Sequence, residues 1–113
     1  MGLGLYILVN GKPEPTDDIN LWGIEFEKNR NIKFDEIDGI SVSTVFLGMD
    51  HSFGSLNPVL FETMVFGGEH DGYTLRYETI EEATIGHKLT IDMVDRRGFR
   101  DKQIKKILNE KVK

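Results

Sequence analysis

Two apolar runs, residues 40–47 and 59–66, dominate the hydrophobic pattern of the chain. Both runs are rich in β-branched and aromatic residues and are too short for isolated helices, which predicts β-strands. Successive residues of a strand point to opposite faces, and both runs carry large apolar residues on both faces. A strand with one solvated face usually carries polar residues on that face. The pattern therefore predicts two central strands of a sheet that is covered on both faces.

Shorter patterns predict three further strands, at residues 5–9, 31–37 and 73–77. The pairs Asn10-Gly11 and Asp38-Gly39 are typical turn residues, and Pro13 and Pro15 keep the segment after the first turn extended. A polar stretch at residues 67–72 forms another turn. Successive hairpin-like connections from residue 31 onward predict an antiparallel sheet of about four or five strands.

A first helix is expected to begin at a Thr16 or Asp17 cap and to end near Arg30, with Trp22 and Phe26 on its apolar stripe. Thr79 begins a second helix and forms a capping box with Glu82. This second helix carries two apolar stripes, whereas a surface helix needs one. The first stripe holds Ile80, Ala83, His87, Ile91 and Val94, and the second holds Ile85, Leu89 and Met93.

The end of the chain predicts a C-terminal amphipathic helix from Asp101, with a narrow apolar stripe among five lysines. This helix would cover the second stripe of the preceding helix or contact another chain. The sequence thus predicts one α+β domain over residues 1–98 and a helical extension over residues 99–113. A homodimer and a monomer are equally compatible with it.

Composition narrows the classes of function. The 113 residues contain no cysteine, which excludes disulfides, thiolate metal sites and cysteine nucleophiles. The formal net charge of −5 argues against a general nucleic-acid binder, because such proteins need clustered Lys and Arg. No apolar run reaches membrane-spanning length, and residues 3–9 fit a strand better than a signal peptide. We therefore expect a soluble cytoplasmic protein.

Two longer motifs carry a family resemblance. The segments VSTVFLGMDH (residues 42–51) and LFETMVFGG (residues 60–68) resemble a family of small uncharacterised proteins encoded by bacteriophages and prophages. Matches at Trp22, Phe26-Glu27, Arg76-Tyr77, Glu82-Ala83 and Gly86-His87 extend the resemblance over roughly residues 5 to 95. The resemblance implies a phage setting and the host-cell cytoplasm. It implies no particular reaction, and the chain departs from the family pattern after Arg96.

Asp50 and His51 lie where the first long strand meets the following loop, a place where polar side chains are readily presented to a ligand. One interpretation makes them a metal or acid–base pair, joined by Glu62 and His87. The other is a turn in which Asp50 caps backbone N–H groups and His51 closes the loop. The second interpretation is favoured, because the spacing matches no zinc signature.

Glu62 shares a strand face with Leu60, Met64 and Phe66. A half-buried carboxylate must be paired or change its pKa, and Arg76 on the next strand is the expected partner. His87 lies in the apolar stripe of the second helix, where a histidine is more often a hydrogen-bonded core residue than a ligand. We predict Asp50, His51, Glu62, Arg76 and His87 as ligand-binding residues, with no catalytic set, cofactor or metal implied.

Three functional hypotheses remain. The first is a non-enzymatic phage accessory protein that binds a host protein or a small nucleotide-like molecule, for counter-defence or metabolic redirection. The second is an interaction or assembly module that works through the C-terminal helix. The third is a small metal-dependent hydrolase, which requires Asp50, His51, Glu62 and His87 to converge.

Overall fold

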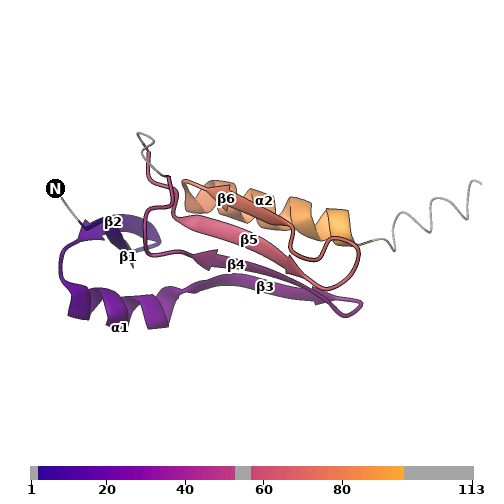
Figure 1. Cartoon of the computed structure of the whole chain (residues 1–113), viewed down its shortest axis with the longest axis horizontal. Coiled ribbons are helices and arrows are strands. Elements are labelled where there is room, and N and C mark those ends of the chain that lie inside the picture. The colour runs from indigo at the N-terminus through magenta and orange to yellow at the C-terminus, as the bar shows by residue number, and fades with distance from the viewer. Residues whose placement is uncertain (1–2, 53–56, 96–113) are drawn as a thin grey trace, which may run out of the picture.

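The computed structural model describes residues 3–52 and 57–95. Their elements follow the order β1 (Leu5–Val9), β2 (Lys12–Thr16), α1 (Ile19–Asn29), β3 (Asn31–Ile37), β4 (Ile40–Phe46), β5 (Phe61–Phe66), β6 (Thr74–Tyr77) and α2 (Ile80–Val94). The strands form a two-stranded sheet, β1-β2, and a four-stranded sheet in the order β3-β4-β5-β6 (Figure 1). The predicted α+β class with antiparallel strands is confirmed. The predicted C-terminal helix, residues 99–113, lies outside the described residues.

Local chemistry explains the order of the larger sheet. Asp38 and Gly39 both have positive φ, 51° and 82°, and form the two-residue turn between β3 and β4. Ile37 pairs with Ile40 directly across this turn. The next pairs in the sheet, β4-β5 and β5-β6, are also antiparallel, so sequence neighbours are spatial neighbours throughout.

Helix α2 covers one face of the larger sheet (Figure 1). The capping box of Thr79 and Glu82 is present and fixes the start of the helix. Buried apolar residues between helix and sheet form two clusters, one around Val42, Val65 and Val94 and one around Phe46, Leu60, Phe61 and Ala83. Burying one such Val, Leu or Phe side chain stabilises the fold by about 1.5–3 kcal/mol, so this interface is the core.

The described residues cover only part of the second stripe of α2. Ile85 and Leu89 are exposed, whereas Met93 packs against the cluster around Val42 and Val94. In the part of the chain that the structure describes, neither helix is long and apolar enough to cross a bilayer.

The opposite face of the larger sheet corrects one expectation. Phe34 is 61% exposed and Phe66 is 50% exposed, although both lie on strands of this sheet. The prediction that the sheet is covered on both faces therefore holds for one face only among residues 3–52 and 57–95. We call the other side, which carries Phe34, Ser43, Met64 and Phe66, the open face.

The β1-β2 hairpin is a second correction, because the sequence predicted only an extended segment after Asn10-Gly11. Residues 12–16 pair with β1 despite Pro13 and Pro15. A proline lacks the N–H that a central strand needs, but it is tolerated on an edge strand. Among the described residues β2 has β1 as its single strand partner and is therefore an edge, so it can contain both prolines.

Gly48 joins the hairpin and α1 to the larger sheet. Its carbonyl accepts hydrogen bonds from the Tyr6 backbone N–H and from the Trp22 indole N–H, both at 2.9 Å. Gly48 has φ 71°, and a Cβ there would lie 3.1 Å from the Trp22 indole nitrogen. Trp22 also stacks on Phe26, as the helical spacing predicted. The N-cap of α1 is Asp18, not the predicted Thr16 or Asp17.

Candidate functional site

Strand register defines which side chains share the open face. Ser43 of β4 pairs with Phe34 of β3 on one side and with Met64 of β5 on the other. Directly paired residues of antiparallel strands point to the same face, so two large apolar side chains flank a small serine. Phe66 pairs with Ser41 in the same manner. Ser43 thus lies between two larger apolar side chains, whereas Ser41 lies between Phe66 and the charged Glu36 of β3.

Glu62 and Arg76 lie next to this apolar region. They are cross-strand partners on β5 and β6, and the Arg76 Nε donates to Glu62 Oε2 at 2.9 Å. The Glu62 side chain is 13% exposed and that of Arg76 is 45% exposed. The expected structural pair is therefore formed. Because Arg76 keeps solvent contact, its remaining donors can bind a ligand without loss of the pair.

Asp50 and His51 adopt the turn interpretation. Asp50 accepts hydrogen bonds from the Ser52 backbone N–H at 2.8 Å, the Ser52 hydroxyl at 3.0 Å and the Val59 backbone N–H at 3.0 Å. His51 Nδ1 lies 2.8 Å from the Met49 carbonyl, which can only accept, so Nδ1 carries a proton. Together these bonds connect the two ends of the loop between β4 and β5.

The loop contacts give a testable acid dependence. Desolvation raises the pKa of Asp50, but the hydrogen bonds from Val59 and Ser52 outweigh it and leave the pKa below the usual 3.8. A carboxyl whose pKa falls on folding stabilises the folded state above its unfolded pKa, and this stabilisation is lost as the pH falls through the folded pKa. We expect Asp50→Asn to be less stable than the wild type at pH 7, and the difference to shrink as the pH falls below 3.8 through the folded pKa of Asp50. Urea unfolding of both proteins over a series of pH values from neutral to acid tests this, and a difference that does not change with pH would contradict it.

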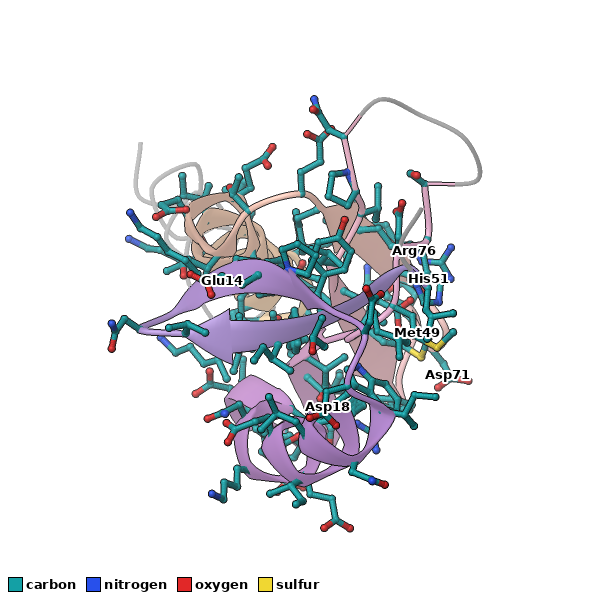
Figure 2. The ribbon with its side chains drawn as sticks, turned by 90° about the vertical axis from the view of Figure 1, so that its left-hand side faces the viewer. Glu14, Asp18, Met49, His51, Asp71 and Arg76 are labelled. Carbon is teal, nitrogen blue, oxygen red and sulfur yellow. The ribbon has the colours of Figure 1, made fainter. Side chains whose placement is uncertain are left out.

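Four of the five predicted residues border the open face. Figure 2 shows Met49, His51 and Arg76 on one side of the molecule, away from α2. Glu62 pairs with Arg76, and Asp50 precedes His51 in the loop. Met49 is itself exposed. The open face is therefore bordered by the ion pair of Glu62 and Arg76 and by the imidazole of His51.

His87 lies on the other side of the sheet. Its Nδ1 is 2.6 Å from Thr44 Oγ1, and its Nε2 is 2.8 Å from Asp35 Oδ2. Thr44 Oγ1 is 2.6 Å from Thr63 Oγ1, which accepts from the Tyr77 hydroxyl at 3.0 Å. We call these five residues the buried network. It links all four strands of the larger sheet to α2.

The direction of each hydrogen bond in the buried network follows from its ends. Tyr77 donates to Thr63, whose single hydroxyl hydrogen is then available for Thr44. Thr44 in turn donates to His87 Nδ1, and His87 Nε2–H donates to the Asp35 carboxylate. Every hydroxyl group is satisfied, and the proton of His87 is placed on Nε2.

The order hydroxyl, imidazole and carboxylate resembles a nucleophilic triad, but burial rules out that use in this conformation. Thr44 and His87 are each 1% exposed, so a substrate cannot reach the hydroxyl. The network is structural. Asp35 was missed by the sequence reasoning because nothing in the alternation of residues 31–37 marks it as a partner for a helix residue 52 positions away.

The four residues of the hydrolase hypothesis do not converge. Glu62 pairs with Arg76 at the open face, and the Asp50 oxygens accept hydrogen bonds from loop groups. His87 is buried between α2 and the sheet. Within the described ranges, no three His, Asp or Glu side chains are grouped so that they could hold a metal ion. Comparison of the chain with protein-family models, curated proteins and solved structures finds no match.

Proposed function

We propose that this protein is a non-enzymatic binding protein that captures a host protein through the open face of its larger sheet. The observation that carries the proposal is the apolar character of that face. Single exposed apolar residues are normal on a protein surface, but grouped ones mark sites of protein interaction. The exposed Phe66 on β5 and Phe34 on β3 form such a group with the half-buried Met64 around the serines of β4.

The shape of the group supports a protein partner. A row of apolar side chains from a partner can pack over Ser41 and Ser43 between the larger residues of β3 and β5, as in face-to-face sheet packing. Interfaces also use an apolar centre with a polar rim. In this proposal Arg76 and His51, at the border of the face, supply the polar rim groups.

The host setting of the proposal comes from the resemblance to phage and prophage proteins. That resemblance implies a small accessory protein that acts in the cytoplasm of the infected cell. A partner in that setting would be a bacterial protein with an accessible apolar surface. Counter-defence or metabolic redirection would then result from blocking that surface.

Charge on the open face is expected to abolish capture. In Met64→Lys/Phe66→Lys, two ammonium groups would have to be desolvated on binding, which we expect to weaken partner binding at least about tenfold. The test is affinity capture from a bacterial lysate, identification of the stoichiometric partner, and measurement of its Kd for each variant.

The matched control is Ile85→Lys/Leu89→Lys, which places the same charges on exposed apolar residues of α2. This control should bind as the wild type does. Photoreactive benzoylphenylalanine at position 66 should crosslink to the partner, whereas the same group at position 89 should not. Equal loss of binding in both variants, or crosslinks from position 89 alone, would refute the placement. Light scattering of the free protein shows whether the captured partner is instead a second copy.

A further inference from the structure

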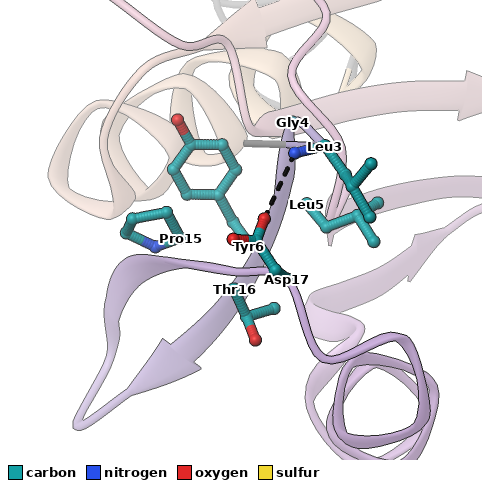
Figure 3. A pocket seen from close by; sticks show the side chains of 7 residues that line it. All are labelled: Leu3, Gly4, Leu5, Tyr6, Pro15, Thr16 and Asp17. Carbon is teal, nitrogen blue, oxygen red and sulfur yellow. Dashed lines mark hydrogen bonds between the residues drawn. The ribbon is translucent and has the colours of Figure 1, made fainter. Parts of the chain in front are cut away.

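One pocket is lined by residues from both sheets and from both helices. Its volume is about 420 Å³, within the range of roughly 300–1,000 Å³ that is usual for small-molecule sites. It forms where the β1-β2 turn, the end of α1, the start of β3 and the start of α2 meet. All its lining residues belong to the described part of the chain. A smaller pocket of about 210 Å³, lined by residues 3–6 and 15–17, is crossed by a hydrogen bond from the Leu3 backbone N–H to Asp17 (Figure 3).

The larger pocket combines apolar and amide groups. Leu8, Ile32 and Ile80 supply half-buried aliphatic surface from three different elements. These three residues also pack against the cluster around Phe46 and Phe61, so their positions are fixed by the core. A flat apolar molecule can therefore lie against a preformed aliphatic surface, which limits the entropy lost on binding.

Asparagine side chains supply the polar groups. Asn10, Asn29 and Asn31 all line the pocket. The Asn29 amide nitrogen donates to Glu25 at 3.2 Å, which leaves its carbonyl oxygen as an acceptor. The Asn10 and Asn31 amides make no hydrogen bond to the described residues, so both can donate to and accept from a ligand. Amides of this kind match molecules whose edges carry adjacent donors and acceptors.

The charged side chains at the pocket indicate whether it suits an ionised or a neutral ligand. Lys28 is the one cationic side chain that lines the pocket within the described residues, and its ammonium lies 3.9 Å from the Glu25 carboxylate. Glu25 therefore offsets the charge of Lys28, and the other lining residues of the described chain are uncharged. The lining offers no cluster of cationic donors of the kind that binds a phosphate. The lining therefore favours an uncharged ligand.

We propose that this pocket binds a neutral planar heterocycle with amide-like edges, of the class of a nucleobase or its nucleoside. The aliphatic residues contact the ring, and Asn10, Asn29 and Asn31 bind its edge. The pocket is distinct from the open face and does not depend on the proposed protein partner.

The test is a titration of ¹⁵N-labelled protein with adenosine, guanosine, cytidine and uridine, and with the 5′-monophosphate of each. At least one nucleoside should give saturable shifts in the side-chain amides of Asn10 or Asn31, and its monophosphate should bind more weakly. Asn10→Gly/Asn31→Ala should raise the Kd at least about tenfold. Glycine at position 10 keeps the positive φ of 52° accessible, so the turn is retained.

Asn20→Ala is the matched control, because Asn20 lies on α1 and does not line the pocket. It should leave the Kd unchanged. Absence of saturable shifts for all four nucleosides at millimolar concentration would overturn the inference. Tighter binding of the monophosphates would overturn the preference for a neutral ligand, and an unchanged Kd in the double variant would overturn the role of the amides.

Discussion

Replacing Gly86 with alanine is expected to lower the free energy of unfolding by about 1–3 kcal/mol, although alanine favours a helix by about 1 kcal/mol over glycine. Gly86 is buried where α2 crosses the sheet, and a Cβ there would collide with the ring and hydroxyl of Tyr77. Tyr77 cannot easily move aside, because its hydroxyl donates to Thr63 in the buried network. The helix would have to rise from the sheet or the hydrogen bond would break.

Gly23→Ala in α1 is the matched control for this prediction. Both glycines are helical, but a Cβ at Gly23 has no neighbour within 4 Å. Gly23→Ala should therefore raise the free energy of unfolding by up to about 1 kcal/mol. Urea unfolding of both variants measures the change in the free energy of unfolding, which should be negative for Gly86→Ala and positive for Gly23→Ala.

A second substitution identifies the collision partner. In a Tyr77→Leu background the shorter side chain no longer reaches Gly86, so Gly86→Ala should cost clearly less than in the wild type. An equal cost in both backgrounds would show that the close approach of Tyr77 to α2 is not what requires glycine at position 86.

The sequence was most informative where the physical cause is local. Thr79 and Glu82 are three residues apart and form the predicted capping box. The Asp38-Gly39 turn was equally readable, because positive φ at both positions is a property of these two residue types. The first predicted stripe of α2, which contains Ala83, His87 and Val94, faces the core, since helical periodicity determines which residues share a face.

Features that depend on pairing between distant residues were not readable in the same way. The β2 strand was missed because its prolines are acceptable only on an edge strand, and the local sequence does not reveal that β2 is an edge. The sheet was expected to be covered on both faces because apolar residues on both sides normally mean burial. Phe34 and Phe66 show that the same pattern also describes an apolar surface left open among the described residues.

The candidate site shows the same division. Pairing of Glu62 with Arg76 was predicted because adjacent strands and a two-residue alternation place them together. His87 was grouped with Asp50, His51 and Glu62 only by chemical type. A shift of one residue along β5 reverses the face, so Thr63 belongs to the buried network whereas Glu62 lies on the open face.

Replacing His87 with alanine is expected to have the largest effect, a loss of about 3–5 kcal/mol in the free energy of unfolding. The variant leaves a cavity and removes the acceptor of the Thr44 hydroxyl, which is 1% exposed and therefore shielded from bulk solvent. His70→Ala, in the turn between β5 and β6, is the control and should change the stability by less than about 0.5 kcal/mol.

A double-mutant cycle separates the hydrogen bond from the packing of His87. Thr44→Val should be costly in the wild type, because it leaves His87 Nδ1 unpaired, and cheaper in a His87→Leu background, where the partner is already absent. ¹⁵N chemical shifts should also show the His87 proton on Nε2, bonded to Asp35. Since His87 bonds to both β3 and β4, a coupling of about 1–3 kcal/mol would mean that the network sets the position of α2 on the sheet. A coupling near zero would mean that apolar packing and the contact of Gly86 with Tyr77 set it.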